Sequence, residues 1–105
     1  MAENPLVEKI ERGPDYFRSG ASYVVEQVAC MNGLRNGALR IQLREIAARI
    51  HDRTYKKNDI RTLELFRKSS RVLGKSLFLS KSLNTVIWQM RHNVWLDEQA
   101  EGGQD

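Results

Sequence analysis

The stretch that decides the fold is residues 37–53, which read GALRIQLREIAARIHDR. Its large apolar side chains recur at steps of four, three and four residues, the spacing that gathers them on one face of an α-helix. They are Leu39, Leu43, Ile46 and Ile50. Two alanines near the middle of the stretch also favour a helix. We therefore expect an amphipathic helix that begins at Gly37 and ends near Arg53.

A second helical face precedes this stretch. Its apolar residues alternate steps of four and three: Phe17, Ala21, Val24, Val28 and Met31. Asp15 can cap its start. Asn-Gly pairs at 32–33 and 36–37 tolerate positive φ angles and lack flanking strands, so we expect a turn or sharp kink there, with one continuous helix as the alternative. Residues 4–14 predict a short helix ahead of this one.

Two further helices are expected after residue 53. A polar connection leads to Asn58 or Asp59, either of which can cap a fourth helix that ends near Gly74. Its apolar residues are Ile60, Leu63, Phe66 and Leu73. Serines lower the helix propensity between Gly74 and Ser82, where a break can fall. The last helix should run to about Asp97, and its apolar residues are Leu83, Val86, Ile87, Met90 and Val94.

These patterns predict an all-α fold without a sheet, because no segment alternates strictly between apolar and polar residues. The arrangement is either a small helical bundle, with about four main helices plus a short N-terminal helix, or a long helical hairpin. One domain over residues 1–96 suits a chain of 105 residues, which is long enough for a modest core. The acidic segment 97–105 has little to bury, so we expect it to be disordered.

The charge distribution predicts an anionic partner. The segment 35–81 contains thirteen of the seventeen Lys and Arg residues but four of the thirteen acids, so it carries +9 while the rest of the chain carries −5. If the fourth helix is continuous at about 100° per residue, five of its cations share one side. Cations at this spacing can reach neighbouring phosphates of a nucleic acid. The candidate contact residues are Arg40, Arg44, Lys56, Lys57, Arg61, Lys68, Arg71 and Lys75.

The same basic face has other interpretations. Solvated helix surfaces also carry Lys and Arg beside apolar stripes. Trp88 and Trp95, seven residues apart, are either core anchors or exposed aromatics of a protein interface. Tyr55 is either an ordinary loop side chain or one that stacks on a base. The fourth helix could also lie on a membrane, but a core explains its apolar residues better in a chain this short.

Residues 43–50, LREIAARI, resemble the first helix of many DNA-binding helix-turn-helix domains. The resemblance covers these eight residues alone. It implies a recognition helix that follows after a tight turn. The glycine expected in that turn is missing at His51, and the connection to the next helix is too long and too charged.

Composition and motifs indicate a chain that is not an enzyme and holds no cofactor or metal. His51 and His92 have no second ligand at helical spacing, and no Gly-rich phosphate loop is present. Cys30 is the single cysteine, so an internal disulfide is excluded, and its apolar neighbours predict a buried side chain. Without a secretory signal pattern or an apolar run near the roughly 20 residues of a membrane span, we expect a cytoplasmic chain.

Two functions fit these observations. The preferred one is a non-catalytic helical binding module whose basic face, centred on residues 57–75, docks on a polyanion. We expect that polyanion to be nucleic acid, alone or within a nucleoprotein complex. The alternative is a protein–protein interaction module, such as an adaptor, an inhibitor or a self-assembling helical hairpin, that binds an acidic protein surface. This alternative includes a homo-dimer, and neither function involves a membrane.

Overall fold

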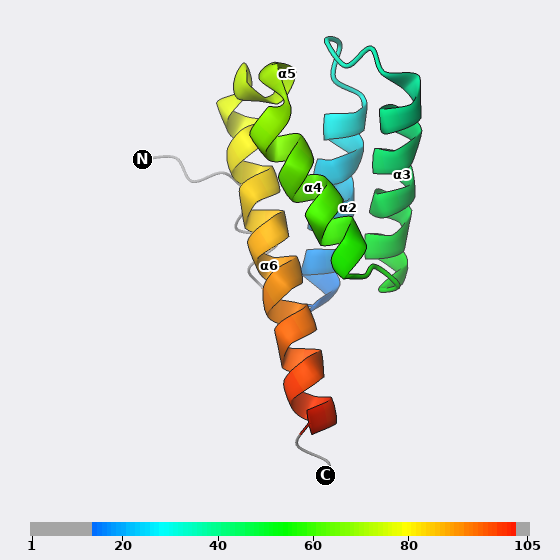
Figure 1. The fold of residues 1–105 in the computed structure, drawn as a ribbon, viewed down its shortest axis with the longest axis vertical. Coiled ribbons are helices and arrows are strands. Elements are labelled where there is room, and N and C mark those ends of the chain that lie inside the picture. Colours follow the sequence, from blue (N-terminus) through cyan, green and yellow to red (C-terminus); the bar gives the residue numbers. More distant parts are fainter. Residues whose placement is uncertain (1–13, 103–105) are drawn as a thin grey trace.

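A computed structural model describes residues 14–102 of the chain, with side chains for residues 20–99 (Figure 1). Within this range the chain forms five helices and no strand. They are α2 (Pro14–Ala29), α3 (Gly37–Asp52), α4 (Lys57–Ser69), α5 (Arg71–Gly74) and α6 (Leu77–Gly102). The prediction of an all-α bundle is confirmed for the described residues. The short helix expected from residue 4 lies outside them.

The main helices form two antiparallel pairs (Figure 1). α2 packs on α3, and α4 packs on α6, which also contacts α2 and the short α5. The bundle measures 48 × 36 × 21 Å, with the long axis set by α6, whose 26 residues extend beyond the other helices at the lower end of the view. The alternative of two very long helices is wrong, because the chain turns after α2, after α3 and around α5.

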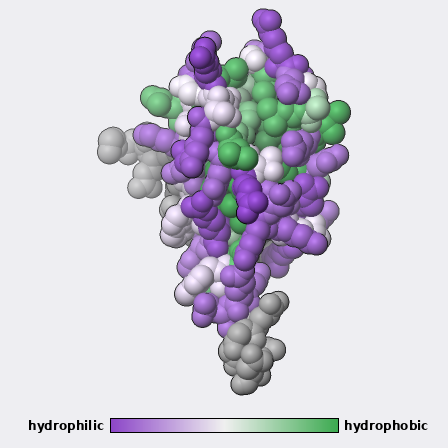
Figure 2. Space-filling model, viewed as in Figure 1, coloured by the Kyte–Doolittle hydropathy of each residue, from purple (hydrophilic) through white to green (hydrophobic). Residues whose placement is uncertain are grey.

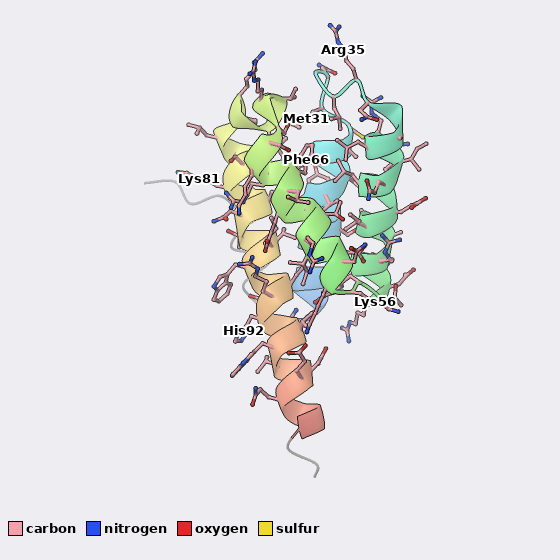
Figure 3. The ribbon with its side chains drawn as sticks, in the orientation of Figure 1. Met31, Arg35, Lys56, Phe66, Lys81 and His92 are labelled. Atoms are coloured by element: carbon pink, nitrogen blue, oxygen red, sulfur yellow. The ribbon has the colours of Figure 1, made fainter. Side chains whose placement is uncertain are left out.

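The core is built from the apolar faces that the helical spacing predicts. Fully buried large side chains come from all five helices, including the four-residue α5. They are Val24, Val25, Val28, Leu43, Ile46, Ile50, Leu63, Leu73, Leu83, Val86 and Met90. Met31 and Phe66 lie near the upper end of the bundle (Figure 3), where Phe66 belongs to the core and Met31 packs against it. Cys30 is exposed, so the prediction of a buried cysteine is wrong: α2 ends at Ala29, which places Cys30 in the turn.

The turn between α2 and α3 uses its two Asn-Gly pairs differently. Asn36 is the N-cap of α3, and its Oδ1 accepts a hydrogen bond from the backbone N–H of Leu39 at 3.1 Å. The pair at 36–37 therefore starts a helix. The turn itself lies ahead of it, at 30–36, where the guanidinium of Arg40 donates to the carbonyl of Leu34. The expected turn is confirmed, and the continuous helix is excluded.

Gly33 provides a test of this turn. A Cβ atom at this position would lie 2.9 Å from Cγ1 of Val72 in α5, closer than packed carbons approach each other. We expect Gly33→Ala to lower the free energy of unfolding by about 1–2 kcal/mol, because the branched side chain of Val72 has to move. The matched change Gly37→Ala meets nothing within 4 Å in the first turn of α3 and should raise stability by about 0.5 kcal/mol. Urea denaturation of both variants measures the difference, and a neutral Gly33→Ala would contradict the contact.

The fourth helix ends earlier than expected, at Ser69. Ser70 adopts an extended backbone (φ −81°, ψ 116°), and its hydroxyl accepts a hydrogen bond from the N–H of Leu73 at 3.2 Å. A serine side chain that bonds the backbone in this way competes with continuation of the helix. The prediction of one helix from about residue 58 to Gly74 is therefore wrong. The break expected after Gly74 is present, and Ser76 Oγ accepts from the N–H of Leu79 as α6 begins.

Three helix ends also differ from prediction. α2 begins at Pro14, so Asp15 lies inside its first turn and is not the cap. α4 begins at Lys57 with Lys56 as the N-cap, so neither Asn58 nor Asp59 occupies that position. α6 continues past Asp97 to Gly102, so part of the segment expected to be disordered is helical. None of the helices in residues 14–102 has the length and apolar content to cross a membrane.

Candidate nucleic-acid interface

Two adjoining hollows lie between α4 and α6. The first, of about 430 Å³, is lined by Arg67 and Lys68 of α4 and by Trp88 of α6, among others. The second, of about 290 Å³, is lined by Lys57 and Arg61 of α4 and by Trp95 of α6, among others. Glu64 and Arg91 line both hollows and form an ion pair that joins the two helices. We call the two hollows together the α4–α6 groove.

Positive charge exceeds negative charge in this groove. Its lining includes five cations, Lys57, Arg61, Arg67, Lys68 and Arg91, and two acids, Glu64 and Glu98. Both acids are engaged, because Glu64 pairs with Arg91 and Glu98 pairs with Lys57. The groove therefore has an excess of three positive charges, and Arg61, Arg67 and Lys68 form no ion pair with any described residue.

Arg67, which lines the first hollow, has one buried polar atom. Its Nε is buried and has no hydrogen-bond partner within the described part of the chain. A buried donor without a partner is unfavourable by about 1–3 kcal/mol, and more when the group is charged.

Three aromatic rings stack along the exposed side of α6. The rings of Trp88 and His92 have centroids 5.6 Å apart and are parallel within 2°, and those of His92 and Trp95 are 6.0 Å apart at 23°. His92 projects from α6 on the side away from α2 and α3 (Figure 3). Trp88 is 60% exposed and Trp95 53% exposed, so neither is a core anchor. We call Trp88, His92 and Trp95 the aromatic ladder.

The structure divides the eight cations that the sequence grouped together. Lys57, Arg61 and Lys68 line the α4–α6 groove. Arg71 and Lys75 lie beyond the break at Ser70 and line neither hollow, because that break ends the continuous helix on which their placement depended.

The remaining three lie outside the groove. Arg40 donates to the carbonyl of Leu34, Arg44 Nη2 donates to the sulfur of Cys30 at 3.6 Å, and Lys56 occupies the N-cap position of α4. Figure 3 shows how widely the basic segment spreads, with Arg35 at the upper end of the α2–α3 turn, Lys81 on α6 and Lys56 at the lower end.

Two groove cations escaped prediction from sequence. Arg67 falls outside the side of α4 that the assumed continuous helix selected. Arg91 lies outside the strongly basic segment 35–81. A usable signal existed for Arg91, because Trp88, Arg91 and Trp95 are spaced by three and four residues and so share one face of a helix.

Tyr55 is anchored within the fold. Its hydroxyl accepts a hydrogen bond from Nδ2 of Asn93 at 3.2 Å, and its ring packs partly against the core. Burial raises the pKa of Tyr55, and the hydrogen bond from Asn93 offsets this in part. A ring held in this way is a tether between the α3–α4 connection and α6, and the structure gives no support to the base-stacking interpretation of Tyr55. In the described residues no group of three His, Cys, Asp or Glu side chains could hold a metal ion.

Comparisons of the chain with protein-family models, with curated proteins and with solved structures found no match.

Proposed function

We propose that the chain is a non-catalytic helical binding module whose α4–α6 groove docks on the phosphate backbone of a nucleic acid, alone or within a nucleoprotein complex. The observation that carries this proposal is the excess of positive charge in one groove, where both acids are already paired and Arg61, Arg67 and Lys68 form no ion pair with any described residue.

The chemistry of these side chains suits phosphate. Arginine presents several N–H donors in a planar fork, and lysine adds a mobile point charge. Each neutralised phosphate releases condensed counterions, which gives an affinity that is independent of sequence and falls steeply with salt. Such contacts fix the position of a nucleic acid but do not read its bases. We therefore expect binding without strong sequence preference.

A salt titration tests the proposal. For about four phosphate contacts, affinity for a generic oligonucleotide should fall roughly 50- to 150-fold between about 50 and 200 mM salt. The double reversal Arg61→Glu/Lys68→Glu should weaken binding at low salt by about 10- to 100-fold and flatten this dependence. Fluorescence anisotropy of a labelled oligonucleotide measures both effects.

A matched control separates location from net charge. Arg35→Glu/Arg44→Glu changes the total charge by the same amount, but Arg35 lies in the α2–α3 turn and Arg44 lies on α3, outside the groove. We expect this control to bind nearly as the unchanged chain does. Equal losses in the two variants would mean that overall charge, and not the groove, determines binding. Salt-insensitive or absent binding would end the proposal.

The protein–protein alternative has one observation in its favour. Leu65, Leu77 and Phe78 are exposed, and hydrophobic residues gather toward the upper end of the molecule in Figure 2. Contiguous exposed apolar surface often marks a protein interface. A stable dimer in sedimentation, combined with no oligonucleotide binding, would favour this function, and the groove cations would then meet an acidic protein surface.

A further inference from the structure

We infer that the nucleic acid in the α4–α6 groove is single-stranded, and that its bases stack on Trp88 and Trp95 of the aromatic ladder. This inference rests on the proposed function, because the groove cations are what hold the phosphates. It adds the form of the ligand and the surfaces that bind its bases.

Each hollow of the groove combines the same two chemistries. In the first hollow, Trp88 stands with Arg67 and Lys68. In the second, Trp95 stands with Lys57 and Arg61. Every nucleotide of a single strand offers one phosphate and one unpaired base, so a wall with one aromatic ring and two cations matches one unit of the strand.

Arg91 connects the two units. It lines both hollows and lies between the two tryptophans on the same face of α6. A strand that passes from one hollow to the next crosses this guanidinium, which retains further donors beside its ion pair with Glu64. The repetition of a ring from α6 and two cations from α4 along the α4–α6 groove, with Arg91 between the two sets, forms a track rather than an isolated pocket.

The aromatic ladder is pre-organised for stacking. Parallel, offset rings at these centroid distances are the favoured arrangement of aromatic pairs, so His92 supports both tryptophan rings from between them. Both tryptophans nevertheless remain more than half exposed. The bases of a duplex have no free face for such rings, whereas unpaired bases stack on them without regard to sequence.

The test compares ligands whose bases are unpaired, absent or paired. The probes are an oligothymidylate of about 12 nucleotides, within the roughly 4–16 nucleotides of known single-strand sites, an abasic oligomer of the same length, and a duplex. The chain has two tryptophans and both belong to the ladder, so intrinsic fluorescence reports on the site directly. We expect the oligothymidylate to quench this fluorescence and to bind at least about 10-fold more tightly than the abasic oligomer or the duplex.

Variants assign the effect to individual rings. Trp88→Ala and Trp95→Ala should each weaken oligothymidylate binding by about 10-fold, and leave binding of the abasic oligomer unchanged. Trp88→Phe should retain most of the affinity, because phenylalanine also stacks, while Trp95 remains as the fluorescent reporter. Leu77→Ala removes another exposed apolar side chain of α6 and should have no effect.

Three other results would overturn the inference. Equal, salt-dependent binding of the oligothymidylate and the abasic oligomer without quenching would remove the ladder from the site and leave the proposed function intact. Tighter binding of the duplex than of the oligothymidylate would also overturn the inference of a single-stranded ligand and leave the proposed function intact. Absence of binding to all three probes would end the inference together with the proposed function. If polyglutamate, added as a fourth probe, bound when the three nucleic-acid probes did not, the partner would be an acidic protein surface.

Discussion

Replacing Leu73 by alanine should lower the free energy of unfolding by about 3 kcal/mol, within the range of about 2–5 kcal/mol for buried leucine. Leu73 is 1% exposed and is the buried residue of α5, which has four residues. So short a helix has almost no stability of its own. Its position against α6 therefore depends on this side chain, and truncation removes the packing and leaves a cavity.

The matched control is Leu77→Ala, the same chemical change four residues later. Leu77 is 73% exposed at the start of α6, so its truncation should alter stability by no more than about 0.5 kcal/mol. Thermal melts suffice, because a loss of 3 kcal/mol lowers the melting temperature of a chain this size by roughly 10–20 °C. Similar melting temperatures for the two variants would show that Leu73 does not hold α5.

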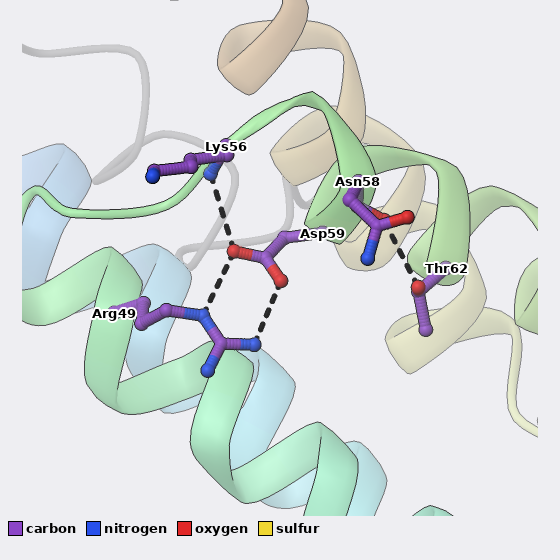
Figure 4. Close-up of polar contacts among 5 residues, drawn as sticks. All are labelled: Arg49, Lys56, Asn58, Asp59 and Thr62. Atoms are coloured by element: carbon purple, nitrogen blue, oxygen red, sulfur yellow. Dashed lines mark hydrogen bonds and ion pairs between the residues drawn. The ribbon is translucent and has the colours of Figure 1, made fainter.

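Replacing Asp59 by alanine should cost about 2–3 kcal/mol, because the carboxylate serves two helices at once. Asp59 is 6% exposed and accepts two hydrogen bonds from Arg49 of α3, Nε to Oδ2 at 2.9 Å and Nη2 to Oδ1 at 2.7 Å (Figure 4). Its Oδ2 also accepts the backbone N–H of Lys56 at 3.2 Å, which caps α4. The variant loses the cap and the tie to α3 together.

The ion pair between Arg49 and Asp59 also predicts that the free energy of unfolding falls at acidic pH. Burial disfavours the charged carboxylate, but the hydrogen bonds from Arg49 and Lys56 and their charges outweigh burial and hold the pKa of Asp59 below its ordinary value. The unfolded chain, with a pKa near 3.9, therefore takes up this proton first as the pH falls. The stabilisation is complete above about pH 5 and is lost as the pH falls through the native pKa.

Denaturation curves across pH check both statements. The difference in stability between the unchanged chain and Asp59→Ala should be full near neutral pH and shrink below about pH 4. Asp52→Ala removes an exposed acid of α3 and changes the net charge by the same amount. We expect this variant to show neither the loss of stability nor its dependence on pH. A constant difference at all pH values would mean that the carboxylate charge contributes nothing.

Helical periodicity made most of the fold predictable. The helix expected from Gly37 to about Arg53 is observed as Gly37–Asp52, with Leu43, Ile46 and Ile50 buried. Burial of one face of each helix is the dominant stabilising term, and it leaves a direct trace in residue spacing. The same logic located Leu63 and Met90 in the core.

Features that depend on hydrogen bonds between side chains and backbone were not predictable in the same way. The break at Ser70 arises because its hydroxyl bonds the N–H of Leu73, an alternative that helix propensity ranks only weakly. Because of this break, Arg71 lies in α5 and not on the basic side of α4, where the prediction of one continuous helix had placed it. The α4–α6 groove depends on how two helices dock, so the sequence alone could not bring Arg67 and Trp88 to one hollow.

The order in which the packed helices follow one another along the chain has a kinetic consequence. α2 with α3, and α4 with α6, are each joined by short connections, so both pairs close small loops during folding. Helical proteins dominated by such local contacts fold in about microseconds to milliseconds. The packing of α2 on α6 joins distant parts of the chain and can form once both pairs exist. We expect rapid assembly in which each hairpin forms first and their docking completes the fold.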